Sequence, residues 1–250
     1  MTTERTTINP RALLAAGVLF LITFITSIPA LWLFQPVLDD PAGYIAGEGV
    51  DGRILLGVVL ETVLVLANIA TAVVLYPVLR RRSETMSLGY VTGRIVESGF
   101  IAIGIIAVLG IVSLRHDDPG AGSLAVSLAQ LKDWTFLLGP GVTVGVANGL
   151  ILGYLMLRSG IVPRRMAILG LAAGPILIAA GMLVLFGVAA PGGTVQSLAT
   201  VPEFAWELYL GVYLTALGLS GRVRTRRAAS PAASGARGPR RAEGATASTP

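Results

Sequence analysis

Six long apolar runs divide this chain, and they constrain its fold more than any other feature. Each run is long enough to cross a hydrocarbon core about 30 Å thick at a helical rise of about 1.5 Å per residue. We therefore predict an all-α, polytopic membrane protein whose domain is a six-helix transmembrane bundle. The predicted spans cover residues 12–34, 53–79, 88–113, 134–157, 164–189 and 202–220.

The residue types in the chain narrow the chemistry that it can perform. Only 13% of the residues are charged, whereas soluble domains carry about 25%. Cysteine is absent and His116 is the single histidine, which excludes disulfides, thiolate metal sites and cysteine nucleophiles. We accordingly predict no metal site, no cofactor and no nucleic-acid partner, and we attribute the net charge of +5 to one side of a membrane.

Arginine gathers in alternate loops, which predicts how the bundle is oriented. Fifteen of the 19 basic residues lie before residue 12, at 80–82, at 158–165 or after 221. Basic loops face the cytoplasm, so both termini should be cytoplasmic, in the multi-pass arrangement of a bacterial cytoplasmic membrane protein. The first run lacks an A-x-A-like cleavage site, which favours a span, kinked or ended by Pro29, over a signal peptide.

Three segments flank or interrupt these spans. Residues 1–11 should form a cytoplasmic N-terminus, and residues 221–250, rich in Ala, Ser, Gly, Pro and Arg, a disordered basic tail. The tail arginines should contact anionic lipid headgroups of the bilayer, with a specific protein partner as the alternative. The stretch Ser123–Trp134 is either an amphipathic helix on the outer surface or an early start of the fourth span, because Leu124, Leu128 and Leu131 recur at i, i+4 and i+7.

Four motifs along the chain carry a family resemblance. They are Gly89, Tyr90, Arg94 and Glu97 at the start of the third run; Asp133 and Trp134 at the start of the fourth; Arg158, Ser159, Val162 and Pro163 after it; and Pro202 and Glu207 in the last. In order and spacing they resemble a bacterial family of integral membrane proteins catalogued as domain-of-unknown-function family 4386, although Met166 stands where that family usually has an aromatic residue near Arg165. The resemblance implies the same six-helix fold and implies no activity.

Polar side chains within the predicted spans are the candidates for function. A charge at the centre of a membrane helix costs about 2.5–3.5 kcal/mol on insertion scales, so such residues should face the bundle interior. We expect Arg94 and Glu97, at i and i+3, to pair at the floor of a polar cavity between the second, third, fourth and sixth spans. The candidate ligand- or proton-binding residues are Glu61, Asn68, Arg94, Glu97, Asn148 and Glu207.

Other residues are assigned structural roles. Glu203, directly after Pro202, suits a helix N-terminus, and Trp32, Trp134 and Trp206 fall near the outer interface. Glycines at four-residue spacing should let helices pack closely, with a hinge or permeation role as the alternative. The glycines concerned are Gly141, Gly145, Gly149 and Gly153 in the fourth span and Gly170 and Gly174 in the fifth.

These features leave three classes of function open. The first is binding or movement of a small cation, a proton or a polar ligand through an intramembrane acidic cavity, because three carboxylates face one arginine there. The second is a non-catalytic membrane subunit or sensor that acts through helix–helix contacts. The third, a lipid-acting membrane enzyme, is disfavoured because the chain has no Asp-rich metal motif and no nucleophile motif.

Overall fold

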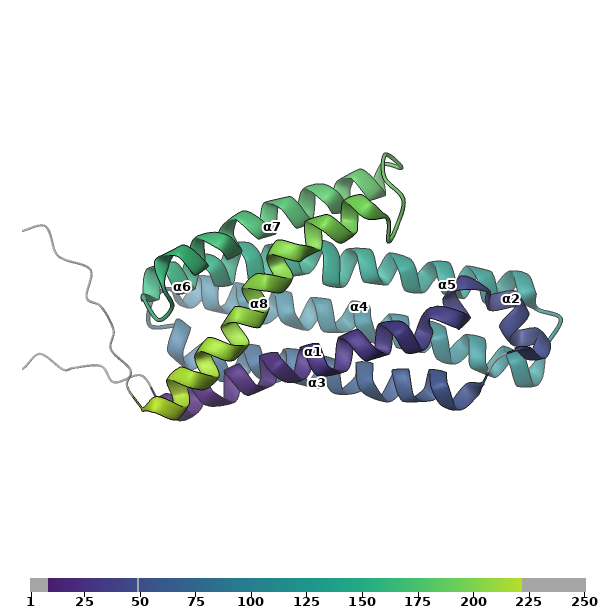
Figure 1. Cartoon of the computed structure of the whole chain (residues 1–250), viewed down its shortest axis with the longest axis horizontal. Helices are drawn as coiled ribbons and strands as arrows, with labels where there is room; N and C mark the ends of the chain where they lie inside the picture. The colour runs from purple at the N-terminus through teal and green to yellow at the C-terminus, as the bar shows by residue number, and fades with distance from the viewer. Residues whose placement is uncertain (1–8, 49, 222–250) are drawn as a thin grey trace, which may run out of the picture.

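The computed structural model describes residues 9–48 and 50–221, and every regular element in this part of the chain is helical (Figure 1). The predicted disordered tail and the first eight residues lie outside the described residues. The elements are α1 (Pro10–Asp39), α2 (Pro41–Gly43), η1 (Tyr44–Glu48), α3 (Asp51–Leu79), α4 (Glu84–Asp117), α5 (Gly122–Phe136), η2 (Leu137–Thr143), η3 (Gly145–Leu152), α6 (Gly153–Ser159), α7 (Arg164–Leu185) and α8 (Thr194–Ser220).

Five of the predicted spans are helices long and apolar enough to cross a membrane. They are α1, α3, α4, the continuous helix Gly122–Ser159 and α7. Their outward faces are apolar, as lipid contact requires, with Ile25 and Ile106 each 68% exposed. The sixth predicted span, α8, has 27 residues but is not among the five. It carries the buried Glu203 and Trp206 and the partly buried Glu207, and these polar groups lower its hydropathy.

The helices extend beyond the predicted membrane segments because local capping, not hydropathy alone, sets where they begin. Asn9 accepts a hydrogen bond from the Arg11 amide at 3.0 Å, and Pro10 occupies the first turn of α1. Ser83 caps α4 in the same way, accepting from the Met86 amide at 3.3 Å. Pro29 does not end α1, which continues to Asp39, so that alternative in the sequence interpretation is wrong.

The fourth span is one helix that changes its hydrogen-bond pattern along its length. It starts at Gly122 and not near Trp134, so the stretch Ser123–Trp134 is an early start of the span, with Ala125 and Ala129 buried in the bundle. Segments η2 and η3 are π-helical. Pro140 has no N–H to donate within η2, and the Thr143 hydroxyl donates to the Leu138 carbonyl at 2.6 Å. Such π-helical segments are rare and frequently occur at functional sites.

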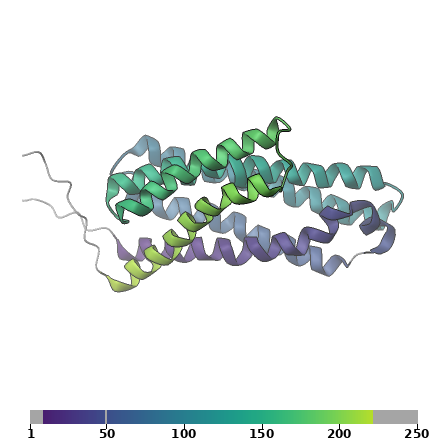
Figure 2. The ribbon, with the colours of Figure 1, turned by 45° about the horizontal axis from the view of Figure 1, so that its top comes forward.

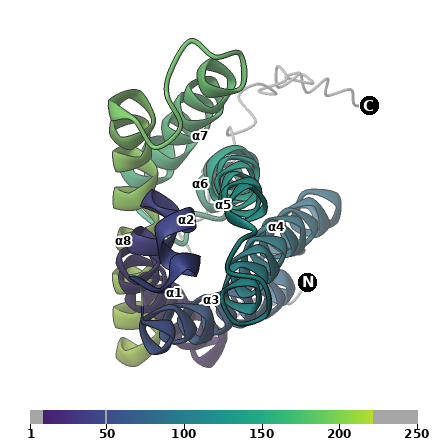
Figure 3. The same ribbon diagram turned by 90° about the vertical axis from the view of Figure 1, so that its right-hand side faces the viewer.

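The helix α8 crosses α1 diagonally, with its last residues beside the first turns of α1 (Figures 1 and 2). Two glycines of α8 allow this approach: a methyl group placed on Gly218 would lie 2.6 Å from the Leu14 Cβ, and one on Gly211 would lie 3.0 Å from the Leu21 side chain. Viewed from the end in Figure 3, α7 and α8 lie to one side of the other long helices. Because the last residues of α8 lie beside the first turns of α1, the described chain begins and ends at the same end of the bundle (Figure 1).

Glycines pack the fourth span against α7, as expected for most of the predicted set. A methyl group on Gly145 would lie 2.8 Å from the Gly174 carbonyl oxygen, Gly149 abuts Gly174 directly, and one on Gly153 would lie 3.0 Å from the Leu171 amide. Two members differ from the expectation. Gly141 has no neighbour closer than 3.7 Å to such a methyl position, and the methyl position of Gly170 meets the Trp206 ring of α8, although the Gly170 backbone lies near Gly153.

Candidate functional site

Arg94 and Glu97 form the predicted ion pair in the interior of the bundle. The Arg94 Nη1 lies 2.7 Å from the Glu97 Oε2, and the two residues are 2% and 4% exposed. Both are on α4 at i and i+3, where helical geometry places side chains on one face. Two opposite charges can be buried inside one span here because each charge compensates the other.

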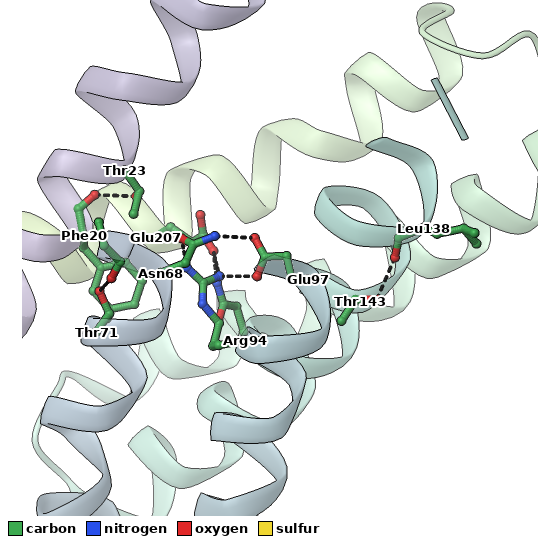
Figure 4. Close-up of polar contacts among 11 residues, drawn as sticks. Phe20, Thr23, Asn68, Thr71, Arg94, Glu97, Leu138, Thr143 and Glu207 are labelled. Atoms are coloured by element: carbon green, nitrogen blue, oxygen red, sulfur yellow. Dashed lines mark hydrogen bonds and ion pairs between the residues drawn. The ribbon is translucent and has the colours of Figure 1, made fainter. Parts of the chain in front are cut away.

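Asn68 of α3 connects these two side chains (Figure 4). Its Nδ2 donates to the Glu97 Oε1 at 3.0 Å, and its Oδ1 accepts from the Arg94 Nη2. The amide thus satisfies the acid and the base at once, and it links α3 to α4. Glu207 of α8 approaches the same guanidinium group, at 3.8 Å from Nη1.

Asn148 of η3 holds Glu207 from the other side. Its Nδ2 donates to the Glu207 Oε1, while its backbone carbonyl accepts from the Trp206 Nε1 at 3.1 Å. Trp206 is fully buried, so its assignment to the membrane interface is wrong: the indole lies in the core and binds the helix that carries Asn148. Five of the six candidate residues therefore lie in one connected cluster of Asn68, Arg94, Glu97, Asn148 and Glu207.

The sixth candidate, Glu61, lies outside this cluster and has its own partner. The Nζ of Lys132 lies 2.7 Å from its Oε1 and 2.6 Å from its Oε2, and the two residues are 6% and 8% exposed. The sequence analysis left Lys132 out of the candidate residues, because the predicted fourth span began at residue 134, just after it. One sequence signal could have identified Lys132 as a candidate: it is the only lysine in the chain. In the structure it lies on the same continuous helix as Asn148.

Glu203 is the second cavity residue that the sequence analysis did not include among its candidates. Because α8 begins at Thr194, Glu203 lies in its interior and not at its N-terminus, and Pro202 is an internal proline. The residue is 2% exposed, and among the described residues neither of its carboxylate oxygens has a hydrogen-bond partner. An unpartnered buried carboxylate is costly, so Glu203 needs an explanation that helix capping does not supply.

A cavity of about 240 Å³ connects these groups. It is lined by all four acids and both cations, Glu61, Glu97, Glu203, Glu207, Arg94 and Lys132, and by Asn68. Its remaining wall is largely apolar and comes from α1, α7, α8 and the fourth span, including Phe24, Ile28, Phe136 and Phe204. Asn148 supports the cavity from behind, through Glu207, and is not one of the lining residues.

The charges of the cavity do not balance. Four carboxylates face two cations, and Arg94 is shared between Glu97 and Glu207. Within residues 9–48 and 50–221, no three His, Cys, Asp or Glu side chains group closely enough to hold a metal ion. An excess of acidic over basic side chains is the chemistry that suits a positively charged group that donates hydrogen bonds to carboxylate oxygens.

The apolar helices and their buried polar cluster define a multi-pass membrane protein. The family described as "Domain of unknown function (DUF4386)" matches residues 15–218. The chain therefore belongs to the DUF4386 family, as the sequence motifs indicated. Comparison with curated proteins gives no match, and comparison with solved structures gives none either.

Proposed function

We propose that this protein binds a small ammonium-type cation inside the membrane domain, with Glu203 as the principal anchor. The observation that carries the proposal is the unpartnered carboxylate of Glu203, 2% exposed and lining the cavity. Keeping a charge away from water costs several kcal/mol unless it is paired and hydrogen-bonded. A bound ammonium group supplies both the missing charge and the missing donors.

The neighbours of Glu203 support a cation over an anion. Glu207 lies one helical turn away on α8, at i+4, and also lines the cavity. Arg94 and Lys132 are each already held by an acid, at 2.7 Å and 2.6 Å, so neither is free to hold an anionic ligand. Intramembrane ionisable residues mark ligand or ion sites by default.

The test measures ligand-induced stabilisation of the full chain in phosphatidylcholine nanodiscs. Ethylammonium chloride should raise the thermal midpoint of the wild type saturably, whereas potassium chloride at equal ionic strength should not. Glu203→Gln should abolish the effect of ethylammonium. Glu84→Gln, at an exposed position at the start of α4, is the matched control and should keep it.

Two results would overturn the proposal. One is a wild-type midpoint that ethylammonium does not raise beyond the effect of potassium chloride. The other is equal stabilisation of the wild type and Glu203→Gln, which would place the cation elsewhere on the protein.

We also propose that α8 is the sixth span and that both termini are cytoplasmic, in a bacterial cytoplasmic membrane. At about 1.5 Å per residue, its 27 residues are long enough to cross a bilayer. Its acids and its Trp206 face the bundle interior rather than lipid, and the arginine-rich loops fall on alternate sides of six spans. A reporter active only outside the cytoplasm should stay dark when fused after Gly221 and light up at residues 190–193; a bright C-terminal fusion would refute the arrangement.

A further inference from the structure

Exposed side chains of α1 and α8 line the cavity, which points to an opening between these two helices. The two helices touch where Gly17 abuts Thr215 and Gly218 abuts Leu14. Farther along, the two helices also meet at the edge-to-face pair of Phe24 and Phe204, with ring centroids 4.9 Å apart. Beyond that pair, α8 diverges from α1 toward α7 (Figure 1).

Apolar side chains line the cavity in the region where the helices separate. Ile28 and Leu31 on α1 are 41% and 51% exposed, Phe136 on the fourth span is 42% exposed, and Phe204 on α8 is 40% exposed. All four line the cavity as well, so each has one side toward the cavity and another toward the outside. With α8 as the proposed sixth span, all three helices that carry these side chains cross the membrane, and the exposed faces of such helices contact lipid. We therefore take the opening to face the bilayer.

We infer that the natural ligand is an amphiphile with a single ammonium head and one hydrocarbon chain, which enters from the bilayer between α1 and α8. This inference rests on the proposed cation site. The acidic floor at Glu203 and Glu207 takes the head, and the rim of Ile28, Leu31, Phe136 and Phe204 contacts the first part of the chain.

The size of the cavity fits this division. At about 240 Å³ it lies below the range of about 300–1,000 Å³ typical of sites that enclose a whole drug-sized ligand. It can hold a head and a few methylene groups, and the remaining chain stays in lipid through the opening. The surplus of carboxylates favours a net cation over a zwitterionic phospholipid, whose phosphate would lie close to those same acids.

The experiment compares a head with and without its chain, on the full chain in phosphatidylcholine nanodiscs. Dodecylammonium should reach half-maximal stabilisation of the wild type at a concentration at least about tenfold lower than ethylammonium, because the lipid-side rim binds the chain. Ile28→Trp narrows the opening and should remove this advantage while leaving the response to ethylammonium. Ile106→Trp, the same change at a 68% exposed position on α4, controls for a new indole in contact with lipid and should behave as the wild type.

The outcomes separate this inference from the proposed function. If neither ammonium compound acts through Glu203, as judged by Glu203→Gln, then the cation site itself is wrong. If ethylammonium acts through Glu203 but dodecylammonium has no advantage, or if Ile28→Trp leaves that advantage intact, the cation site stands and lateral entry is refuted. Stabilisation by phosphatidylethanolamine in the disc equal to that by dodecylammonium would refute the preference for a net cation.

Discussion

Two polar clusters in this bundle use the same side-chain chemistry with opposite charge balance. In the loop-end cluster, Asp51 is the single acid among several donors. The Tyr44 hydroxyl donates to its Oδ1 at 2.6 Å, Arg115 Nη1 lies 2.7 Å from the same oxygen, and His116 Nε2 lies 2.8 Å from Oδ2. One carboxylate thus receives at least two donors, and His116, with a side chain 63% exposed, meets water as well.

In the buried cluster the ratio is reversed. The Arg94 side chain, 2% exposed, is shared by Glu97 and Glu207, while Glu203 has no partner among the described residues. Hydrogen-bond donors thus outnumber the carboxylate in the loop-end cluster, where water could replace them. Carboxylates outnumber the donors in the buried cluster, where water could not. Stability alone explains the loop-end cluster. It does not explain an acid surplus inside the membrane domain, and this contrast makes the buried cluster the functional candidate.

The largest expected effect is at Arg94. Arg94→Leu leaves Glu97 and Glu207 without their cation, at a cost of about 3–5 kcal/mol of unfolding free energy. Glu97→Leu should cost a similar amount, since it leaves Arg94 with a single, more distant acid. The double variant should recover much of the loss, because it leaves neither member of the pair buried alone.

Reversible unfolding in mixed micelles measures this cycle, with the free energies of the two single variants compared with that of the double. Additive losses would mean that the two groups do not stabilise each other and that the buried cluster is held by packing alone. The double variant also tests the proposed anchor. If Glu203 holds the cation, ethylammonium should still raise the thermal midpoint of the double variant.

A somewhat smaller effect is expected at Lys132. Its side chain and that of Glu61 are 7% and 11% exposed, against 2% and 6% for Arg94 and Glu97, so water can relieve part of the cost. Lys132→Met should fall toward the lower end of about 3–5 kcal/mol, and Glu61→Gln in the same chain should restore most of it. Unfolding in mixed micelles measures both. If Lys132→Met were as stable as the wild type, the buried Lys132–Glu61 ion pair would contribute nothing to the free energy of unfolding.

The predictable part of the fold is the part that the membrane itself dictates. Apolar runs and alternating arginines depend only on local composition, so five of the predicted span regions coincide with helices long and apolar enough to cross a membrane. Their ends were less predictable: caps such as Asn9 and Ser83 extend two of these helices, and the fourth begins at Gly122 rather than at residue 134. The Arg94–Glu97 pair was also predictable, because i, i+3 spacing needs no tertiary information.

The part that failed depends on where helices begin and how they face one another. Starting the fourth span at residue 134 hid Lys132, and treating Pro202 as a helix start hid Glu203. A tryptophan near a predicted span end looks the same in sequence whether it faces lipid or, as Trp206 does, packs on Gly170. The unpaired acid that carries the proposed function was accordingly the residue least visible in the sequence.

The smallest expected effect concerns Tyr44, in the loop-end cluster, and it should diminish at alkaline pH. Burial, followed by the hydrogen bond to Asp51, raises the pKa of Tyr44 to about 12, whereas an unfolded tyrosine titrates near 10. Between these values the unfolded chain has lost the proton and the folded chain keeps it, so stability should fall as the pH rises through this window. Below pH 10 the contribution is fully present.

Tyr44→Phe removes both the hydrogen bond and the titration. Near neutral pH the variant should be less stable than the wild type by about 1.5–3 kcal/mol, the usual range for a hydrogen bond to a charged group. Between about pH 10 and 12 the gap should narrow, because only the wild type loses stability through this group. Thermal midpoints in detergent across this range measure the gap, and Tyr154→Phe, at a 39% exposed position, controls for the loss of one hydroxyl. A gap that stays constant to about pH 12 would show that the loop-end cluster does not hold the Tyr44 proton, and the contrast drawn between the two clusters would then rest on charge count alone.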